Sequence, residues 1–268
     1  MMNDPLVSII IPTFDRKKIL LKTINNVLKQ TWKNIEIIII DDGISINLEP
    51  IIKSLKNGKI IYEKTEKNMG CALSRAIGVN LSKGDFIAFI DDDDEWHENY
   101  LINQLEVFKE NKAIDFVISN YKINYFNQFE EIKNMESYVF NFQNKILESP
   151  GPFFQCCVFK KKILNNINNL VDTDCIPSED WDFFINLSIK NPIVGFSKQI
   201  GFTWNLSTNS QSFNFSNEAK GITNLIKKHK KIIIKSCGQI MLSNHYRRIA
   251  RIYEKLKDYN KIKLFYKK

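Results

Sequence analysis

Hydrophobic and polar positions alternate in blocks along the first hundred residues. Short apolar runs at 7–11, 35–40 and 86–90 are typical of buried parallel strands. Between them, apolar residues recur at helical spacing over 19–28, and 71–81 is predicted to form a second helix. Repeated strand–helix alternation predicts an α/β fold with a doubly wound, mainly parallel sheet flanked by helices.

The same pattern extends through further segments and then weakens. Residues 59–62 and 116–118 are predicted strands, and 98–109 is a predicted helix. After about residue 125 we expect mixed strands and short helices, followed by a helical tail. We therefore expect a domain at 1–215 and a basic helical extension at 216–268.

Polar clusters follow three of the predicted strands. Pro12 ends the first strand and begins a Pro-Thr-Phe-Asp segment, Asp41 and Asp42 follow the second, and an acidic run follows the strand that ends near Ile90. Ligands of open α/β sheets bind beyond the carboxyl ends of the strands. The three clusters are therefore expected to converge on one crevice.

The acidic run at 91–95 is the strongest chemical signal. Two like charges about 4 Å apart repel by about 4 kcal/mol at an effective dielectric of about 20, so the run either raises its pKa values or recruits a cation. On an extended segment Asp91 and Asp93 point the same way and can share one partner. Carboxylate oxygens suit Mg²⁺ or Mn²⁺. The alternative is a solvated acidic turn that caps the next helix.

Two other acidic segments carry weaker signals. Asp42 is suited to accept hydrogen bonds from a base or ribose, although Asp-Gly is also an ordinary turn pair. Glu179 and Asp180 precede an apolar run, and Ser178 is placed to cap a helix there. Acids in a first helical turn are favoured by the helix dipole without any catalytic role.

Charge and cysteine content narrow the class of protein. Five cysteines without CxxC spacing indicate reduced thiols rather than a zinc site or a disulfide framework. The start of the chain does not resemble a secretory signal, and the apolar runs are shorter than the roughly 20 residues that span a bilayer. We therefore expect a cytoplasmic protein.

The basic residues are concentrated in the tail. Residues 219–268 contain 15 Lys and Arg against two acidic residues, a balance of +13, whereas the rest of the chain is acidic by five charges. Such a tail suits an anionic membrane at the inner face of the cell, or a nucleic acid. The alternative, which is compatible with membrane binding, is a solvated helical cap whose Ile222, Leu225, Tyr246 and Tyr253 pack on the domain. A basic-tailed binding protein without catalysis is accordingly the alternative function, but it leaves the first 215 residues unexplained.

Five segments, in order, resemble family 2 glycosyltransferases. Val7–Arg16 (VSIIIPTFDR) is similar to the opening of that family, and Glu36–Gly43 (EIIIIDDG), preceded by the Gln-Thr-Trp at 30–32, is similar to its next motif. The segments Asn68–Arg75 and Lys83–Asp94 resemble "NxGxxxAR" and "GxYIxFLDxDD", and Glu179–Asp182 resembles the "EDW" motif. The likeness covers residues 5 to about 212 and leaves out the tail.

The resemblance implies a GT-A fold and an inverting transfer of sugar from a nucleotide diphosphate donor, most simply a UDP-sugar. It also implies a glycan or lipid-linked glycan acceptor, as in bacterial surface glycan assembly, and Mn²⁺ or Mg²⁺ as cofactor. No nucleic acid partner is expected. By position it implies a set of nucleotide-binding residues: Pro12, Thr13, Phe14, Asp42, Asn68, Arg75, Asp91 and Asp92. Asp93 is the implied chief metal ligand with Asp91 beside it, Asp180 is the implied catalytic base, and Glu179 is the rival base.

The sequence departs from the family pattern at two places. Asp15 stands where the family usually has Asn. Near the end of the domain, Asn205 and Ser207 stand where the family often has Arg and His, and that His lies near the metal and diphosphate. The departure implies either a different hold on the diphosphate, for example by tail lysines, or a weaker metal site.

Other enzymes with this type of sheet fit the sequence less well. A sugar-nucleotide pyrophosphorylase needs a Gly-rich basic loop after the first strand, and a dehydrogenase needs GxGxxG there; Pro12–Phe14 matches neither. A phosphoacceptor regulator uses paired aspartates but does not account for residues 91–95 or 179–182.

Overall fold

The apolar runs of the chain form the strands of one twisted sheet. The computed structural model describes residues 4–55, 58–126, 128–167, 171–206 and 214–267. The strands in these ranges are β1 (Val7–Thr13), β2 (Ile35–Asp41), β3 (Ile60–Lys64), β4 (Phe86–Phe89), β5 (Glu95–Trp96), β6 (Phe116–Tyr125), β7 (Phe129–Lys133), β8 (Cys157–Lys160) and β9 (Val194–Leu206). Their order in the sheet is β3-β2-β1-β4-β8-β6-β9-β5, and β7 pairs with β6.

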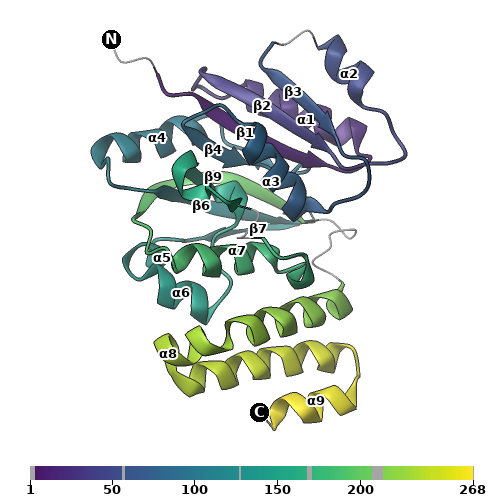
Figure 1. The fold of residues 1–268 in the computed structure, drawn as a ribbon, viewed down its shortest axis with the longest axis vertical. Helices are drawn as coiled ribbons and strands as arrows, with labels where there is room; N and C mark the ends of the chain where they lie inside the picture. Colours follow the sequence, from purple (N-terminus) through teal and green to yellow (C-terminus); the bar gives the residue numbers. More distant parts are fainter. Residues whose placement is uncertain (1–3, 56–57, 127, 168–170, 207–213, 268) are drawn as a thin grey trace.

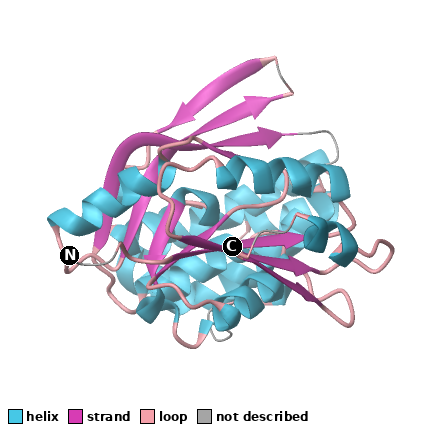
Figure 2. Ribbon diagram, turned by 90° about the horizontal axis from the view of Figure 1, so that it is seen from above, coloured by secondary structure: helices cyan, strands magenta, loops and turns pink. Residues whose placement is uncertain are grey.

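Helices flank this sheet (Figure 1; Figure 2). The α-helices of the described ranges are α1 (Lys17–Leu28), α2 (Glu49–Ser54), α3 (Cys71–Leu81), α4 (Tyr100–Glu110), α5 (Ser137–Phe140), α6 (Phe142–Glu148), α7 (Glu179–Ser188), α8 (Phe215–Lys255) and α9 (Tyr259–Tyr266). Short 3-10 helices are η1 (Phe154–Cys156), η2 (Lys161–Leu164) and η4 (Thr173–Cys175). The predicted strands and helices of the first hundred residues are therefore confirmed, with small shifts at their ends.

The first strand is longer than its sequence suggests. Pro12 does not end β1 but pairs with Ile40 of β2, and the strand continues to Thr13. Proline has no N–H to give to a ladder, so it is tolerated only where no strand needs that donor. On the other side of β1, pairing with β4 already stops at Ile10 and Phe89, so the missing N–H costs no hydrogen bond of the sheet.

The sheet is parallel in its first half and mixed in its second. Strands β3, β2, β1 and β4 run parallel, as expected of a doubly wound unit. β8 is antiparallel to both β4 and β6, and β9 then runs parallel to β6. Consequently the carboxyl ends of β1, β2 and β4 lie at one edge, where the polar clusters follow them.

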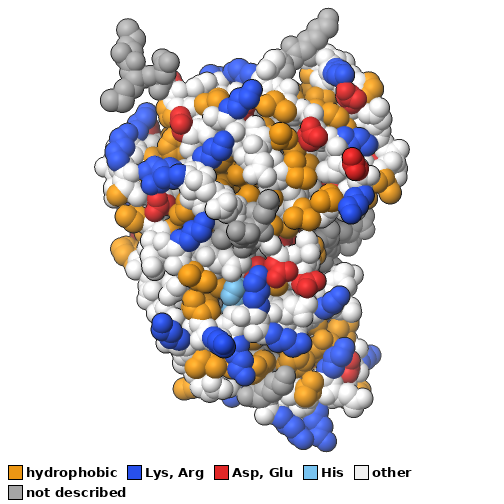
Figure 3. Space-filling model, in the orientation of Figure 1, with side chains coloured by type: hydrophobic (Ala, Val, Ile, Leu, Met, Phe, Trp, Pro, Cys, Tyr) orange, Lys and Arg blue, Asp and Glu red, His pale blue; other side chains and the backbone are white. Residues whose placement is uncertain are grey.

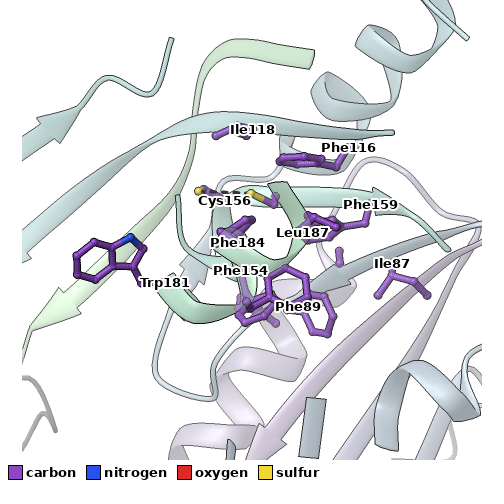
Figure 4. Close-up of a cluster of buried hydrophobic side chains, with 14 of the residues drawn as sticks. Ile87, Phe89, Phe116, Ile118, Phe154, Cys156, Phe159, Trp181, Phe184 and Leu187 are labelled. Carbon is purple, nitrogen blue, oxygen red and sulfur yellow. Dashed lines mark hydrogen bonds between the residues drawn. The ribbon is translucent and has the colours of Figure 1, made fainter. Parts of the chain in front are cut away.

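An aromatic core ties the sheet to α7. Phe116 of β6 stacks on Phe159 of β8 with ring centroids 5.3 Å apart, and Phe184 of α7 packs against both (Figure 4). Phe154 of η1 lies 4.9 Å from Phe89, which comes two residues before the acidic run. Such pairs contribute about 0.5–1.5 kcal/mol each beyond the burial of area. The acidic run and the start of α7 are therefore both anchored to the same aromatic core.

The basic tail is helical and packs on the body of the protein. Gly238, with a φ of +84°, breaks α8 into two segments that run back along each other below α6 and α7 (Figure 1). Tyr246 and Ile249 are buried, whereas Ile240 and Tyr259 are largely exposed. Lys and Arg side chains are numerous around α8 and α9 (Figure 3). Within the described ranges, no helix combines the length and apolar character needed to cross a bilayer.

Candidate active site

The strand ends, α3, α7 and α8 enclose one cleft of about 560 Å³. Its lining includes every residue that the sequence singles out as a site candidate: Pro12, Thr13, Phe14, Asp42, Asn68, Arg75, Asp91, Asp92, Asp93, Glu179 and Asp180. Glu179 and Asp180 thus come together in one cavity with candidates that all lie before residue 94. A cleft of this size suits a small-molecule ligand.

Asp42 organises the loop that leads into α3. Its carboxylate accepts hydrogen bonds from the backbone N–H groups of Met69 and Gly70, both at 2.7 Å, and from Thr65 Oγ1 at 2.8 Å. Asn68 also accepts from Gly70 N–H through its side chain, at 3.0 Å. Gly70 has a φ of +81°, which favours glycine at this bend. Both Asp42 oxygens are therefore already engaged, and they fix the loop along the cleft wall.

Asp15 holds the loop that follows β2 in a similar way. Its carboxylate accepts hydrogen bonds from the N–H groups of Ser45 and Ile46, at 3.0 and 2.9 Å. A Cβ on Gly43 would stand 2.5 Å from Asp15 Oδ1, so only glycine fits between the two segments. The departure from Asn at position 15 thus preserves an acceptor that holds the loop after β2.

The acidic run forms a turn instead of the extended segment assumed from the sequence. Asp94 N–H donates to the Asp91 carbonyl at 3.2 Å, which closes the turn. Asp91 and Asp93 consequently have different partners. Asp93 lies 2.9 Å from Arg16, which also pairs with Asp92 at 3.1 Å, whereas Asp91 pairs with Arg75 at 2.8 Å. The expectation of an extended segment is therefore wrong, and in this turn Asp91 and Asp93 pair with different arginines.

These carboxyl groups are short of positive charge. Burial raises the pKa of Asp92 to about 6, although the Thr13 hydroxyl at 2.6 Å and Arg16 oppose the rise. Burial and the charge of Asp91 raise the pKa of Asp93 as well. The Asp93 side chain is nevertheless 41% exposed and faces the cleft, so its oxygens are accessible. A hard divalent cation fits this set of oxygen donors.

Arg75 joins the two acidic motifs. Its guanidinium is 3% exposed and lies 2.8 Å from Asp91, 3.1 Å from Asp180 and 4.0 Å from Glu179. It also lies 4.6 Å from the centre of the Phe154 ring. A buried cation of this kind needs carboxylate partners to offset its desolvation. Arg75 therefore fixes the distance between the end of β4 and the start of α7.

Asp180 and Glu179 open α7 in a poorly solvated corner. Burial raises the pKa of Asp180 to about 7; Arg75 opposes the rise, and the charges of Glu179 and Asp91 add to it. Burial also raises the pKa of Glu179, again against Arg75. Ser178 precedes the helix, but its side chain makes no capping hydrogen bond. Trp181 is 4% exposed and donates to the Ile146 carbonyl, so its main role is in the core, as expected.

Other lining residues escaped the sequence analysis. Gln155 is buried and donates from Nε2 to Asp91 Oδ2 at 2.5 Å, while its Oε1 has no hydrogen-bond partner among the described residues. Trp204 of β9 and Phe153 form an edge-to-face pair, with centroids 5.0 Å apart, on the other wall. Glu218 of α8 also lines the cleft. Of these residues, only Trp204 lies in a segment compared with the family pattern, directly before Asn205, so the fold places the others here without a motif.

Of the two residues that depart from the family pattern near the end of the domain, the structure describes only Asn205. Asn205 accepts a hydrogen bond from Asn124 at 3.1 Å through its side-chain oxygen, near the end of β9. Ser207, which stands in the place of the family histidine, lies outside the described residues.

Comparison with known proteins supports a glycosyltransferase. A family model described as glycosyl transferase family 2 matches residues 8–167. The chain is 30% identical over 226 residues to the Escherichia coli UDP-Glc:alpha-D-GlcNAc-diphosphoundecaprenol beta-1,3-glucosyltransferase WfgD, covering 82% of this chain and 83% of WfgD. It spans only about a third of the length of the uncharacterized glycosyltransferases of Rickettsia bellii, Rickettsia conorii and Rickettsia felis that it also matches.

Solved structures share the fold at low sequence identity. Staphylococcus aureus TarS 1–349 in complex with UDP-GlcNAc superposes with a TM-score of 0.67 at 15% identity, covering 97% of this chain and 90% of that one. The mannosyltransferase PcManGT from Pyrobaculum calidifontis, in complex with GDP-Man and Mn²⁺, gives a TM-score of 0.64 at 12% identity, covering 98% and 79%. By its match over more than half its length and by its GT-A fold, this chain belongs to glycosyl transferase family 2.

Proposed function

We propose that the chain transfers a sugar from a nucleotide diphosphate sugar, most simply a UDP-sugar, to an acceptor hydroxyl with inversion. One observation carries the proposal: Arg75 holds Asp91 of the acidic run and Asp180 of α7 on either side of itself, in a cleft that all the candidate residues line. The two chemical tasks of displacement, stabilising a leaving diphosphate and activating a hydroxyl, thus have separate acidic groups.

The nucleotide is assigned to the wall built by the first three strand ends. Pro12 and Phe14 would line the base, and Asp42 with the Asn68–Gly70 loop would meet the base edge and ribose. Phe14 is 43% exposed, as suits a side chain that a ligand covers. Asp91 and Asp92 complete the wall beside the ribose and phosphates.

Asp93, with Asp91, is the proposed holder of a divalent cation. When bound, Mn²⁺ or Mg²⁺ supplies a positive charge that stabilises the departing diphosphate. Arg16 already neutralises Asp92 and Asp93 in part, next to the oxygens that would hold the cation. With Ser207 in the place of a histidine, Arg16 is the described cation best placed to share the contact with the diphosphate.

Asp180 is the proposed general base. The acceptor oxygen attacks the anomeric carbon as the bond from that carbon to the diphosphate oxygen breaks; the acceptor proton passes to Asp180, and the bonding electrons leave with the diphosphate. A positioned carboxylate contributes about 10²–10⁴-fold to such a step. Arg75 keeps Asp180 oriented, and Glu179 beside it is assigned to the acceptor or to the loop.

The acceptor is proposed to be a lipid-linked glycan at a membrane surface, as in bacterial surface glycan assembly. WfgD, similar over most of its length, is named for a diphosphoundecaprenol-linked acceptor. The basic tail at 219–268 carries exposed apolar side chains among its lysines, including Tyr259 and Leu264. Each Lys or Arg near an anionic leaflet contributes about 1 kcal/mol to membrane binding.

A donor-hydrolysis screen tests the activity without knowledge of the acceptor. The purified chain is incubated with UDP-, GDP- and dTDP-sugars in the presence of Mn²⁺ or Mg²⁺, and release of nucleotide diphosphate is measured. We expect release from one nucleotide class, with inverted configuration in the sugar product by NMR. Folded protein that releases no nucleotide diphosphate from any donor would contradict the proposal.

A further inference from the structure

On α7, a network of polar and charged side chains surrounds one buried carboxylate that does not line the cleft. Asp182, two residues after Asp180, is fully buried. Its Oδ1 accepts a hydrogen bond from His229 Nε2 at 2.6 Å, and its Oδ2 lies 2.8 Å from Lys228 Nζ. Lys228 also pairs with Asp172 at 2.8 Å. Lys228 and His229 both belong to α8, so the network joins the tail to the helix that carries the proposed base.

Among the described residues, Lys228 supplies the positive charge between the two carboxylates of this network. The ligand atoms of Asp172, Cys175 and Asp182 lie within 4.8 Å of one another, a spacing that a metal ion can use. However, Lys228 already stands between the two carboxylates. Burial opposes its charge, but the hydrogen bonds to Asp172 and Asp182 raise the pKa of Lys228. The protein thus supplies the cation itself, and the arrangement is that of a structural clamp.

A second set of contacts joins α8 to the segment before α7. Asn224 Nδ2 donates to the Asp174 carbonyl at 2.9 Å. A Cβ on Gly221 would stand 2.6 Å from the carbonyl oxygen of Ile176, so the helix backbone lies directly on this segment. The same stretch of α8 supplies Glu218 and Ile222 to the lining of the cleft. The first turns of α8 therefore contact either the cleft or the segment that precedes α7 and Asp180.

We propose that Lys228 and His229 are positioning residues that act through Asp182 to hold the start of α7, and with it Asp180, at the reacting centre. The inference rests on the proposed function, since it assigns the purpose of the network to the base. It makes α8 a part of the catalytic architecture, although the family model ends at residue 167. On the opposite side, Arg75 draws Asp180 toward Asp91, so α7 is held from both faces.

The expected effect is on rate and not on nucleotide affinity. A displacement of about 1 Å at a reacting group costs up to about 100-fold in rate. The nucleotide wall is formed by the ends of β1, β2 and β4, which the network does not touch. His229→Leu and Lys228→Met should therefore lower kcat about 10- to 100-fold, with UDP affinity unchanged. His229→Gln keeps an N–H that can reach Asp182 and should restore much of the rate.

The test compares these variants with a matched control. Lys230→Met removes an exposed lysine from the same helix and should behave as wild type. Each variant is measured for thermal stability, UDP binding by calorimetry, kcat in donor turnover, and hydrogen exchange of the α7 amides. We expect faster exchange at the start of α7 in His229→Leu and Lys228→Met, together with the fall in kcat.

Three results would overturn the proposal: wild-type kcat in His229→Leu and Lys228→Met, a loss of UDP affinity in parallel with kcat, or His229→Gln as impaired as His229→Leu. The exchange measurement separates this proposal from the proposed function. If the wild-type chain turns over no donor, the function fails, whereas unchanged exchange of the α7 amides in both variants overturns the clamp by itself.

Discussion

Arg16 Nη1 lies 2.9 Å from Asp93 Oδ2, so a side chain of the protein occupies the position where the diphosphate and its cation are expected. The same guanidinium contacts Asp92. Arg16 is 43% exposed and free to move, but Asp92 is 5% exposed, so a departing Arg16 leaves behind a buried carboxylate that needs another cation. The ion pairs of Arg16 are therefore expected to form or break according to what binds in the cleft.

Asp93→Asn should lose most of the activity and keep the fold, because Asp93 is exposed and its loss leaves no buried partner. Charge stabilisation by a metal contributes several kcal/mol to the transition state, so kcat should fall about 100-fold or more. Calorimetric titration of UDP with and without Mn²⁺ should show that the metal-dependent gain in affinity has gone. Glu95→Gln, the same change at an exposed position outside the cleft, is the control. Equal UDP affinity with and without Mn²⁺ in the wild type, with turnover that resists EDTA, would refute a metal role.

Arg16→Gln should let the nucleotide-free protein bind Mn²⁺ more tightly, because it removes a positive charge from Asp92 and Asp93. A partly exposed ion pair is worth about 0.2–1 kcal/mol, so the gain should be at most about fivefold. Calorimetric titration with Mn²⁺ alone measures it. A weaker or unchanged affinity for Mn²⁺ would mean that the guanidinium does not compete with the cation.

The activity should fall in mildly acidic solution. Asp180 must be ionised to accept a proton, and its pKa is raised to about 7, so kcat should decline as the pH drops through about 7. The charge of Glu179 contributes to that rise, so Glu179→Gln should move the acidic limb of the profile to lower pH. The measurement is kcat against pH at saturating donor for both proteins. An acidic limb that stays in place in Glu179→Gln would show that another group controls it.

The basic tail should direct the chain to anionic membranes. Liposome flotation at low salt should recover more protein with anionic than with neutral vesicles, and the preference should weaken as salt rises. Replacing the exposed Lys263 and Lys267 by Glu should reduce this preference. The matched control is the same change at two other exposed lysines, Lys22 of α1 and Lys29 directly after that helix. The tail would have no role in membrane binding if the wild type showed no preference for anionic vesicles, or if both lysine pairs lost the same share of bound protein.

The sequence predicts the fold well where local patterns decide it. β-branched runs and helical spacing locate β1, α3 and β4 because each signal is contained in a dozen residues or fewer. The convergence of three polar clusters was also predictable, since carboxyl ends of parallel strands meet at one edge. The acidic run was harder, because its hydrogen-bonded turn depends on Arg16 and Arg75, which arrive from other elements.

Contacts between segments far apart in the chain could not be predicted from the sequence. Arg75 and Asp180 are 105 positions apart, and only the packing of α7 on the aromatic core brings them together. Gln155 has no motif around it, yet it reaches Asp91. For the tail, the sequence predicts an anionic surface or packing on the domain, but it does not reveal that Lys228 and His229 contact Asp182 of α7.

Asp180→Asn is the most direct test of the mechanism. The amide has the same shape but cannot take the acceptor proton, so kcat should fall about 10²–10⁴-fold. UDP affinity should stay nearly unchanged, because the nucleotide wall is on the other side of Arg75. Glu179→Gln, the same chemical change one residue earlier, should lose less. Near-normal turnover in Asp180→Asn would reduce Asp180 to an ion-pair partner of Arg75, and a larger loss in Glu179→Gln would transfer the role of base to Glu179.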